Sequence, residues 1–320
     1  MVKWQGNPEK GVLFVLSLLL FQEICQMFVA LVLGWLIVRC GVLKSGDSKI
    51  LSVIALYLIF PCVIINAFQI EYTSDRVQGM LLALGAAVLT HLIFFALTAA
   101  LRKPLHLSPV EQASIIYSNA GNLTIPIVAA VLGSEWVLYV SMYILVQQLL
   151  LWSHCRFLLS GENQFSWKKA LLNVNILSIF TGMALFFLRL PLPAFLKGAA
   201  ASIGGMIGPI SMMVAGMLIG NVDCKRLLQP GIWKVVLLRL VFFPLVVLLV
   251  LKHSGMAALV PDGSTLLLVS LLSSVTPSAA AVTQLAQVYS DEGEAAGLIN
   301  VATTVLCLAT IPVLCALYQL

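Results

Sequence analysis

Two long apolar segments of this chain are interrupted by polar and proline residues at corresponding places in its two halves. The first interruption reads SNAGNLTIP over residues 118–126, and the second reads SSVTPS over residues 273–278. Inside a bilayer such a break exposes N–H and C=O groups that lipid cannot hydrogen-bond, so it survives only beside protein or a cavity. Paired breaks in two halves of a chain predict the binding site of a transporter.

The composition indicates a helical membrane protein with many spans. Hydrophobic residues make up 61% of the 320 residues, charged residues only 10%, and the mean hydropathy is +1.04. Soluble domains carry about 25% charged residues. The net charge of +5 does not indicate nucleic-acid binding, because the Lys and Arg residues are scattered over short loops. The seven cysteines form no Cys-x-x-Cys pair, so we interpret them as small apolar residues.

About 20 apolar residues span a bilayer as a helix, and this rule predicts ten spans in the chain. The longest polar stretch, near residues 160–169, divides the chain into a first half, 1–160, and a second half, 161–320, of five spans each. We expect the apolar run at 12–21 to be an uncleaved start of the first span, because no small-x-small cleavage site follows it. The expected spans are 20–40, 48–69, 77–101, 108–133, 135–158, 168–190, 199–221, 231–251, 263–289 and 295–318.

The distribution of Lys and Arg predicts the orientation. Eleven of them lie on the side that holds the loops after spans one, three, five, seven and nine, and six lie on the opposite side. Positively charged loops stay in the cytoplasm. We therefore expect a multi-pass protein of the cell (inner) membrane with both termini outside.

Three spacings favour an internal repeat. Gly34 and Gly182 are 148 positions apart, as are the two prolines Pro61 and Pro209, and Pro126 and Pro277 are 151 apart. Membrane helices are rich in Gly and Pro, so coincidence is the alternative. An odd number of spans per half makes the repeat inverted, which is the architecture of many secondary transporters.

The break in span four is the strongest candidate for a substrate site. Asn119 and Asn122 bring side-chain donors and acceptors into the membrane, and Gly121 permits irregular backbone. Pro126 removes an N–H, and a half-helix that starts near it would aim the positive end of its dipole at the break, which favours an anion. The alternative is two proline-kinked helices whose polar residues only satisfy freed backbone groups. The candidate substrate-binding residues are Asn66, Asn119, Gly121, Asn122, Thr124, Pro126, Ser274, Thr276, Pro277 and Ser278.

Three other residues inside the spans are assigned structural roles. Pro61 and Pro209 kink spans two and seven. Arg239 lies well inside span eight, where a charge costs about 2.5–3.5 kcal/mol, so it must face protein or water. We interpret Arg239 as a structural residue that bonds helix-end carbonyls or reaches the inner face, with a counter-charge for an anionic substrate as the alternative. Span seven also contains a GxxxG at 216–220, which we expect to pack within the chain rather than at a dimer face.

Several function classes lack support in the sequence. The chain has no P-loop, HExxH, Gly-x-Ser-x-Gly or Cys/His cluster, and no span holds a pair of acidic residues. We therefore expect neither an enzyme nor a primary pump, and no cofactor or metal. His91 and His154 lie in spans three and five, where a local hydrogen bond is the usual role of histidine and a proton relay is the alternative.

At these motifs the chain resembles the auxin efflux carrier family, in its bacterial malonate/malate-type permease branch. The resemblance runs almost end to end, and the Asn–Gly–Pro element of span four is its most specific part. Where the family often has a second glycine, this chain has Thr124. The shared motifs are LGWL at 33–36 before GVL at 41–43, FPC at 60–62, SNAGN at 118–122 with Pro126, GMLIG at 216–220, Arg239-Leu240 with Pro244, and Pro277 followed by Ala286 and Tyr289.

The resemblance implies an all-α protein with ten transmembrane helices in two inverted five-helix repeats. Spans four and nine would be broken and would cross at the substrate site. Spans 1, 2, 6 and 7 would form a scaffold, and spans 3–5 with 8–10 a moving transport domain. The implied substrates are small carboxylates such as malonate or malate, and the similar fold of bile-acid/sodium symporters leaves ion coupling open.

The sequence therefore predicts a secondary transporter for a small organic anion, a mono- or dicarboxylate, working by alternating access. The alternatives are a sodium-coupled symporter of the bile-acid-symporter-like fold and a non-transporting membrane sensor. The expected partners are the organic anion and the lipid bilayer, without nucleic acid. A homodimer is left open.

Overall fold

The computed structural model describes residues 28–161, 174–220, 227 and 229–319. The starts of expected spans one and six, and the basic residues 168–169, lie outside these residues. The described part is helical, and its only β-type pairing is a single bridge. The helices are Phe28–Arg39, η1 Ser45–Asp47, α2 Ser48–Ile54, η2 Ala55–Ile59, α3 Phe60–Ala67, α4 Ser74–Leu101, α5 Pro109–Ile116, η3 Ala120–Thr124, α6 Ile125–Val131, η4 Ser134–Trp136, α7 Val137–Leu150, η5 Leu151–Cys155, α8 Arg156–Ser160, α10 Val174–Phe187, α11 Ala194–Gly204, α12 Ile207–Ile219, α14 Pro230–Leu237, η6 Leu238–Phe242, α15 Phe243–His253, η7 Met256–Leu259, α16 Gly263–Val275, α17 Ala280–Tyr289 and α18 Gly293–Gln319.

Within the described residues, six helical segments are long and apolar enough to cross a membrane, and they fall on expected spans two, three, five, seven, eight and ten. Shorter apolar helices stand at the other four expected spans. Spans four and nine are short because each is interrupted, and spans one and six are described only in part. The six segments are Ser45–Ala67, Ser74–Leu101, Ser134–Ser160, Ala194–Leu218, Pro230–His253 and Gly293–Tyr318.

Three of the intramembrane prolines are preceded by a π-helical turn. Proline has no N–H and its ring collides with the carbonyl four residues earlier, so an α-helix cannot continue unchanged through it. In η2, η3 and η6 the residue just before the proline donates its N–H to a carbonyl five residues back instead. These wider turns lead into Pro61, Pro126 and Pro244, and they accommodate each proline without ending the helix.

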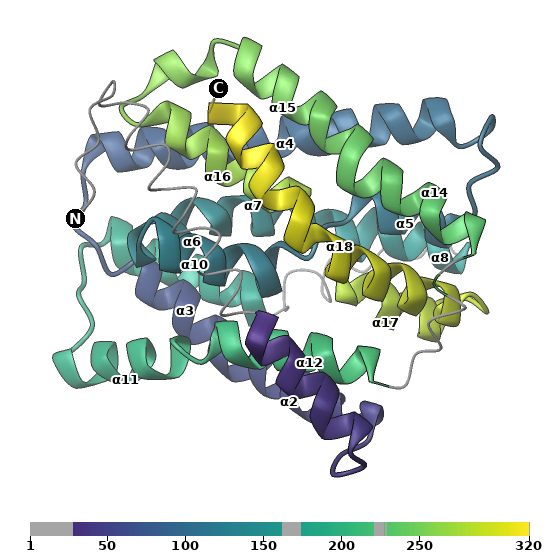
Figure 1. Ribbon diagram of the computed structural model, residues 1–320. Coiled ribbons are helices and arrows are strands. Elements are labelled where there is room, and N and C mark those ends of the chain that lie inside the picture. Colours follow the sequence, from purple (N-terminus) through teal and green to yellow (C-terminus); the bar gives the residue numbers. More distant parts are fainter. Residues whose placement is uncertain (1–27, 162–173, 221–226, 228, 320) are drawn as a thin grey trace, which may run out of the picture.

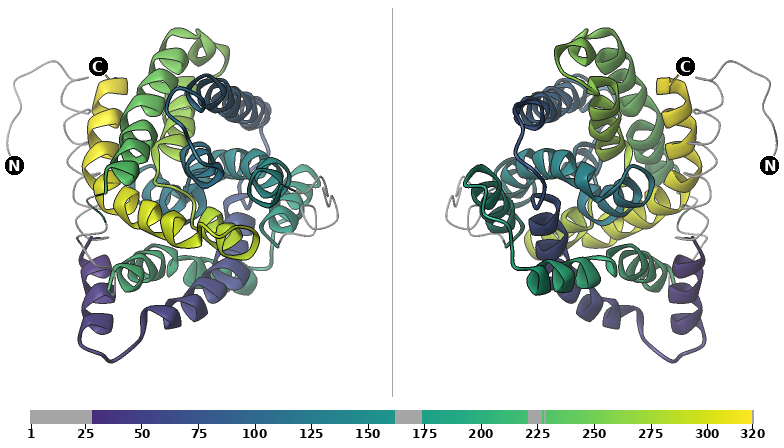
Figure 2. Two further views of the ribbon diagram at one scale, coloured as in Figure 1. Left: turned by 90° about the vertical axis from the view of Figure 1, so that its right-hand side faces the viewer. Right: turned by 90° about the vertical axis from the view of Figure 1, so that its left-hand side faces the viewer.

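The helices form two groups. In the small helix group, α2, α3, α10, α11 and α12 pack together, and the helix Phe28–Arg39 packs on α12. Most of these helices lie along the lower side of Figure 1. In the large helix group, α4 to α8 and α14 to α18 pack together above them. The two side views separate the same groups (Figure 2). The large group contains both interrupted helices.

Glycines allow very close helix contacts within the small helix group. A Cβ on Gly34 would lie 2.2 Å from the carbonyl oxygen of Met213, and one on Gly216 would lie 1.9 Å from that of Leu31. A Cβ on Gly182 would lie 2.5 Å from the ring of Phe68. Only glycine fits at these positions, and Gly216 of the GxxxG packs against another helix of its own chain.

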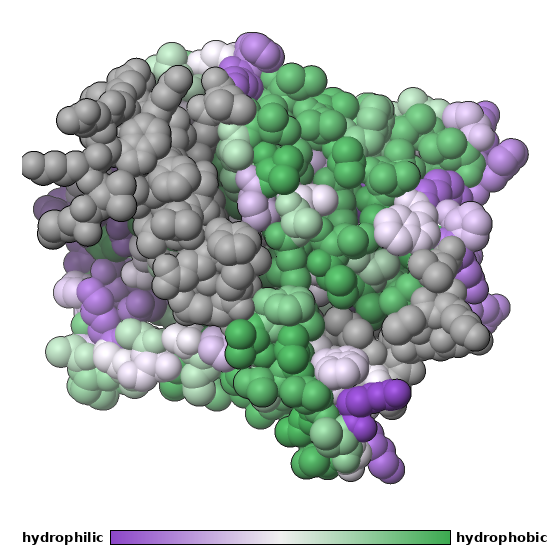
Figure 3. Space-filling model, in the orientation of Figure 1, coloured by the Kyte–Doolittle hydropathy of each residue, from purple (hydrophilic) through white to green (hydrophobic). Residues whose placement is uncertain are grey.

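The outer surface carries the apolar side chains expected of a protein in lipid. Leu249 of α15, Leu92 of α4 and Ile50 of α2 are more than half exposed. Figure 3 shows apolar surface across the middle of the molecule, with hydrophilic residues concentrated toward its ends. Exposure of large apolar residues on this scale is unfavourable in water and favourable in a bilayer.

Candidate functional site

The two sequence breaks meet at one point inside the large helix group. Ser118, between α5 and η3, and Ser278, between α16 and α17, pair as an isolated antiparallel bridge. The N–H of Asn119 donates to the carbonyl of Pro277 at 2.9 Å, and the N–H of Ala279 donates to the carbonyl of Tyr117 at 2.9 Å. The interrupted helices therefore cross through extended backbone, and we call this point the crossing.

A neighbouring helix satisfies the remaining backbone groups on each side of the crossing. The amide of Gln147, on α7, accepts from the N–H of Ser118 at 3.0 Å and donates to its carbonyl at 2.8 Å. On the other side, Thr303 of α18 accepts from the N–H of Ser278 at 3.2 Å, and Asn300 donates to its carbonyl at 2.6 Å. An unpaired buried backbone group costs about 1–3 kcal/mol, so these side chains stabilise the crossing.

Arg239 binds the carboxyl ends of both interrupted helices. Its side chain is completely buried, in η6. The guanidinium donates to the carbonyl of Ile115 in α5 at 2.9 Å, and to those of Ser274 and Thr276 at the end of α16 at 2.7–3.0 Å. The carboxyl end of a helix carries negative partial charge. One positive charge thus faces the negative ends of two helices.

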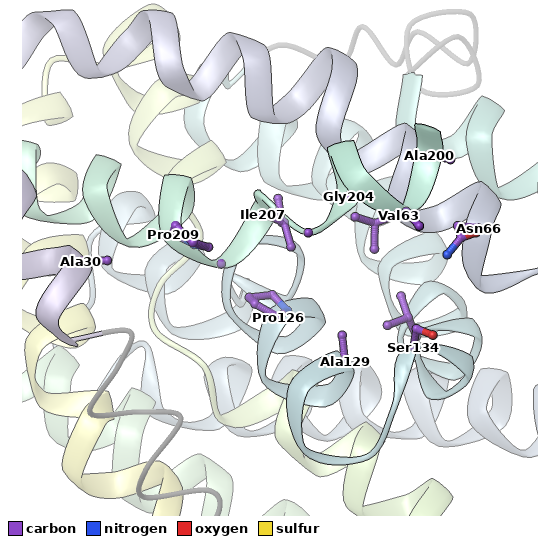
Figure 4. A pocket seen from close by; sticks show the side chains of 14 residues that line it. Ala30, Val63, Asn66, Pro126, Ala129, Ser134, Ala200, Gly204, Ile207 and Pro209 are labelled. Carbon is purple, nitrogen blue, oxygen red and sulfur yellow. The ribbon is translucent and has the colours of Figure 1, made fainter. Parts of the chain in front are cut away.

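Two cavities lie where α6 and the crossing face the small helix group. The larger has a volume of about 570 Å³ and a mostly apolar wall from α3, α6, α11 and α12. Figure 4 shows Pro126 and Ala129 of α6 facing Ile207 and Pro209 across it, with Asn66 and Ala30 toward opposite ends. The Asn66 side-chain oxygen is buried and has no hydrogen-bond partner among the described residues.

The smaller cavity lies beside the crossing itself and has a volume of about 30 Å³, enough to hold a water molecule. Its polar wall consists of Asn119, Asn122, Asn300 and Thr304, and Met212 is among the apolar residues of α12 that close it. Asn122 donates its side-chain amide to the Oδ1 of Asn119 at 2.9 Å. No charged side chain lines either cavity in the described part of the chain.

The predicted site residues divide between the two cavities and the protein interior. Asn119, Asn122 and Pro277 line the small cavity, and Asn66 and Pro126 line the large one. Gly121 lines neither cavity and lies against the ring of Phe60. The other candidates, Thr124, Ser274, Thr276 and Ser278, are fully buried and line neither cavity.

The hydroxyls of the second break are used locally. The Ser274 hydroxyl donates to the carbonyl of Leu271 at 2.7 Å, and that of Thr276 to the carbonyl of Ser273 at 3.2 Å. Thr124 donates across to the carbonyl of Leu272 on α16 at 3.5 Å. These bonds occupy hydroxyl donors that would otherwise be unpaired in the interior.

The structure corrects one feature of the predicted break. The half-helix of span four does not start near Pro126 but at Ala120, with Asn119 as its N-cap. The π-turn η3 allows helical backbone to continue up to Pro126, so the proline lies inside the helix rather than at its start. Pro277, in contrast, lies within the extended break itself.

The sequence analysis missed residues outside the breaks that support the crossing or line the small cavity. Gln147, Asn300, Thr303 and Thr304 are polar residues inside otherwise apolar spans five and ten. That signal is weak, because many polar residues in these helices bond only to their own backbone, as Ser141 does to the carbonyl of Val137. A stronger signal is that a polar pair stands in the span after each break, Gln147-Gln148 after the first and Thr303-Thr304 after the second.

Residues 19–164 match the model of a family described as membrane transport protein. No curated protein matches the chain. The matched segment contains the first break. The second break, which crosses the first, lies in the second half of the chain. Together with the long apolar helices, this similarity indicates a multi-pass membrane transport protein.

Proposed function

We propose that this protein is a secondary transporter for a small organic anion, a mono- or dicarboxylate, and that it works by alternating access. The observation that carries this proposal is the crossing, with two asparagines beside it in a cavity. Asn119 and Asn122 would contact the substrate directly. Gly121, Thr124, Pro126, Ser274, Thr276, Pro277, Ser278 and Asn66 would shape the site and the way to it.

The charges at the crossing support an anion as the substrate. Four helix ends meet there, and Arg239 holds the two negative ones at Ile116 and Val275. The two positive ends begin at Ala120 and Ala280, next to the small cavity. A helix N-terminus favours a negative charge by about 0.3–1 kcal/mol when exposed and up to about 2 kcal/mol when partly buried. Among the described residues of the cavity walls, no acidic side chain opposes this preference.

The location of the cavities supports alternating access. Both are bounded by the large helix group on one side and by α12 of the small helix group on the other. A shift of one group against the other would open or close the crossing to either side of the membrane. In this proposal the small group is the scaffold and the large group is the transport domain.

The same proposal includes ten spans in two inverted repeats, 1–160 and 161–320. Two pairs of contacts support it. Gly34 of the first span packs on α12 of the seventh, as Gly182 of the sixth packs on Phe68 at the end of the second. The fifth span supports Ser118 through Gln147, as the tenth supports Ser278 through Asn300 and Thr303.

A sodium-coupled symporter is the second candidate, because amide and hydroxyl oxygens in the small cavity are also ligands for a hard cation. The two positive helix ends favour the anion over it. A thermal-stability screen of the purified protein against organic acids, with and without sodium, tests both. We expect stabilisation by carboxylates but not by their neutral amides. Equal stabilisation by amides would contradict the anion proposal, and carboxylate binding that requires sodium would favour the symporter.

We also propose an inner-membrane location with both termini outside, which follows from the charge of the loops. Exposed glycines offer a pair of test positions, Gly161 after α8 and Gly255 after α15. In intact cells, an impermeant thiol reagent should label Gly255→Cys but not Gly161→Cys, in a background without the exposed Cys40. The reverse pattern would reverse the orientation.

A further inference from the structure

His91 and Arg239 occupy equivalent places in the two proposed repeats. They are 148 positions apart, and the same spacing separates Pro61 from Pro209. His91 lies in α4, in the third span, and Arg239 in η6, in the eighth, and both side chains are fully buried. The Arg239 guanidinium lies over the ring of Phe94, one turn after His91 on α4, at 5.4 Å. The two ionisable side chains are therefore neighbours next to the crossing.

The hydrogen bond of His91 determines which ring nitrogen carries a hydrogen. Its Nδ1 lies 2.8 Å from the carbonyl oxygen of Ala87, which can only accept, so Nδ1 is the donor. In a neutral ring Nε2 then has a lone pair and no hydrogen. This nitrogen is buried and has no partner among the described residues. Such a group needs an explanation, and a proton is the ligand that an imidazole nitrogen binds near neutral pH.

Tyr143 connects His91 with the crossing. Its ring packs on the ring of His91 with the centroids 4.9 Å apart. Its hydroxyl pairs with that of Ser118 at 3.4 Å, and the hydroxyl of Ser118 also bonds to the side chain of Gln147. His91 is thus separated by one side chain from the backbone through which the two breaks pair.

The ionisable groups around His91 determine when it can take a proton. Arg239 of η6 is positive and opposes a second positive charge, whereas Tyr143 of α7 is a phenol and uncharged near pH 7. His154 of η5 packs against Phe95 of α4, one turn from His91. α16, which also packs on α4, carries no ionisable side chain. The other ionisable groups of the helices packed on α4 lie toward the helix ends: Tyr139 of α7, Lys252 and His253 of α15, and Glu111 of α5.

A bound anion changes this balance. While the site is empty, the charge of Arg239 and the apolar surroundings oppose a proton on His91. A carboxylate at the crossing adds a negative charge nearby, so it favours a positive charge on the ring. The effect is reciprocal, because a proton on His91 strengthens anion binding by the same factor by which the anion strengthens proton binding.

We infer that His91 binds a proton together with the carboxylate, so that the protein is a proton–carboxylate symporter. This inference rests on the proposed transport of organic anions. The proton adds to the lone pair of Nε2 on the side where the substrate enters, and it leaves the same nitrogen on the side where the substrate is released. No other bond forms or breaks. One proton and one monocarboxylate cross together, so the transport of a monocarboxylate is electroneutral.

The pH dependence of binding tests this inference on the purified full-length protein. Propionate, lactate and malonate serve as probes between about pH 6.5 and 8.5, where their carboxylates remain mainly ionised. In the wild-type protein, affinity should fall as the pH rises, by up to about tenfold per pH unit, which is the limit for one linked proton. His91→Gln should remove this dependence. His154→Gln is the matched control, because His154 is also in a span but pairs with Tyr117 at 2.9 Å, and it should retain the dependence.

A second measurement detects the proton itself in the wild-type protein. In weakly buffered solution with an indicator dye, addition of a bound carboxylate should withdraw up to one proton per protein. His91→Phe, which keeps an aromatic ring against Tyr143, should bind without withdrawing a proton and replaces His91→Gln where that variant does not fold.

The outcomes separate this inference from the proposed function. Carboxylate binding that is independent of pH and withdraws no proton, or the same pH dependence in a folded His91 variant, would overturn the role of His91 and leave organic-anion transport standing. Binding of none of the three acids at any pH would contradict the proposed transport of small carboxylates, and this inference with it.

Discussion

The two breaks meet at one crossing but are built differently. In the first, a short extended stretch at Tyr117 leads into the π-turn η3, and the half-buried Asn119 and Asn122 face a cavity. In the second, extended backbone from Thr276 to Ala279 leads directly into α17, and its hydroxyls are buried. The first break thus presents side chains to the cavity, whereas the second contributes mainly backbone. A sequence that repeats a proline-containing break need not repeat its chemistry.

The largest effect is expected at the side chains of the first break. Asn122→Ala should reduce uptake by at least about tenfold, because it removes a substrate contact and the hydrogen bond to Asn119. Ser273→Ala is the matched control in the second break, since its hydroxyl bonds only to the carbonyl of Val269. Uptake by each variant should be measured at equal amounts of protein in the membrane. Normal transport by both Asn119→Ala and Asn122→Ala would remove the asparagines from the site.

Arg239 joins the two breaks, so its replacement should affect stability more than affinity. Arg239→Gln leaves up to three carbonyls without their charged donor, at about 1–3 kcal/mol each. We expect a marked loss of thermal stability in detergent. The thermal stability of Arg239→Lys should lie between that of the wild-type protein and that of Arg239→Gln, because lysine keeps the charge but not the forked set of donors.

The same variants also test the account of the charges. The folded fraction of the Arg239→Gln variant should still bind carboxylates, because the positive N-terminal ends of η3 and α17 remain. Carboxylate affinity is measured against pH in the wild-type protein and the variant. A variant of normal stability that binds no carboxylate would show that Arg239 itself holds the substrate charge.

Replacing the side chains that support each break should reduce stability in proportion to the number of backbone groups that each side chain satisfies. Gln147→Leu leaves both the N–H and the carbonyl of Ser118 unpaired, at a cost of about 2–6 kcal/mol. Thr303→Val leaves only the N–H of Ser278 unpaired, at about 1–3 kcal/mol. Denaturation of both variants in the same detergent gives the comparison. A smaller loss for Gln147→Leu than for Thr303→Val would contradict this view of the crossing.

The sequence predicted the features that depend on composition and local chemistry. Runs of apolar residues located the long helices, because length and hydropathy alone determine whether a helix fits a bilayer. Asn119, Asn122 and Pro277 were recognisable because polar and proline residues are costly in lipid. The GxxxG at 216–220 indicated close packing within the chain, although not which helix Gly216 contacts.

Other features depended on contacts between distant segments. Nothing within span five shows that Gln147, rather than Gln148, reaches the backbone of Ser118, 29 residues away. The start of η3 was misplaced because a proline usually marks the first turn of a helix, and the π-turn that accommodates Pro126 has no simple sequence signature. Asn300, Thr303 and Thr304 of α18 were missed because polar residues in apolar helices often bond only to their own backbone.

The smallest effect is expected at Ser278, the centre of the second break. Its hydroxyl is fully buried and has no partner among the described residues, so Ser278→Ala removes an unsatisfied polar group. The stability should change by no more than about 1 kcal/mol, with a gain as the expected sign, because the backbone contacts of Ser278 with Asn300 and Thr303 remain. Uptake should fall far less than in Asn122→Ala. If uptake by Ser278→Ala is lost while the protein remains stable, the unpaired hydroxyl serves the substrate in another conformation, and the second break contributes side-chain chemistry after all.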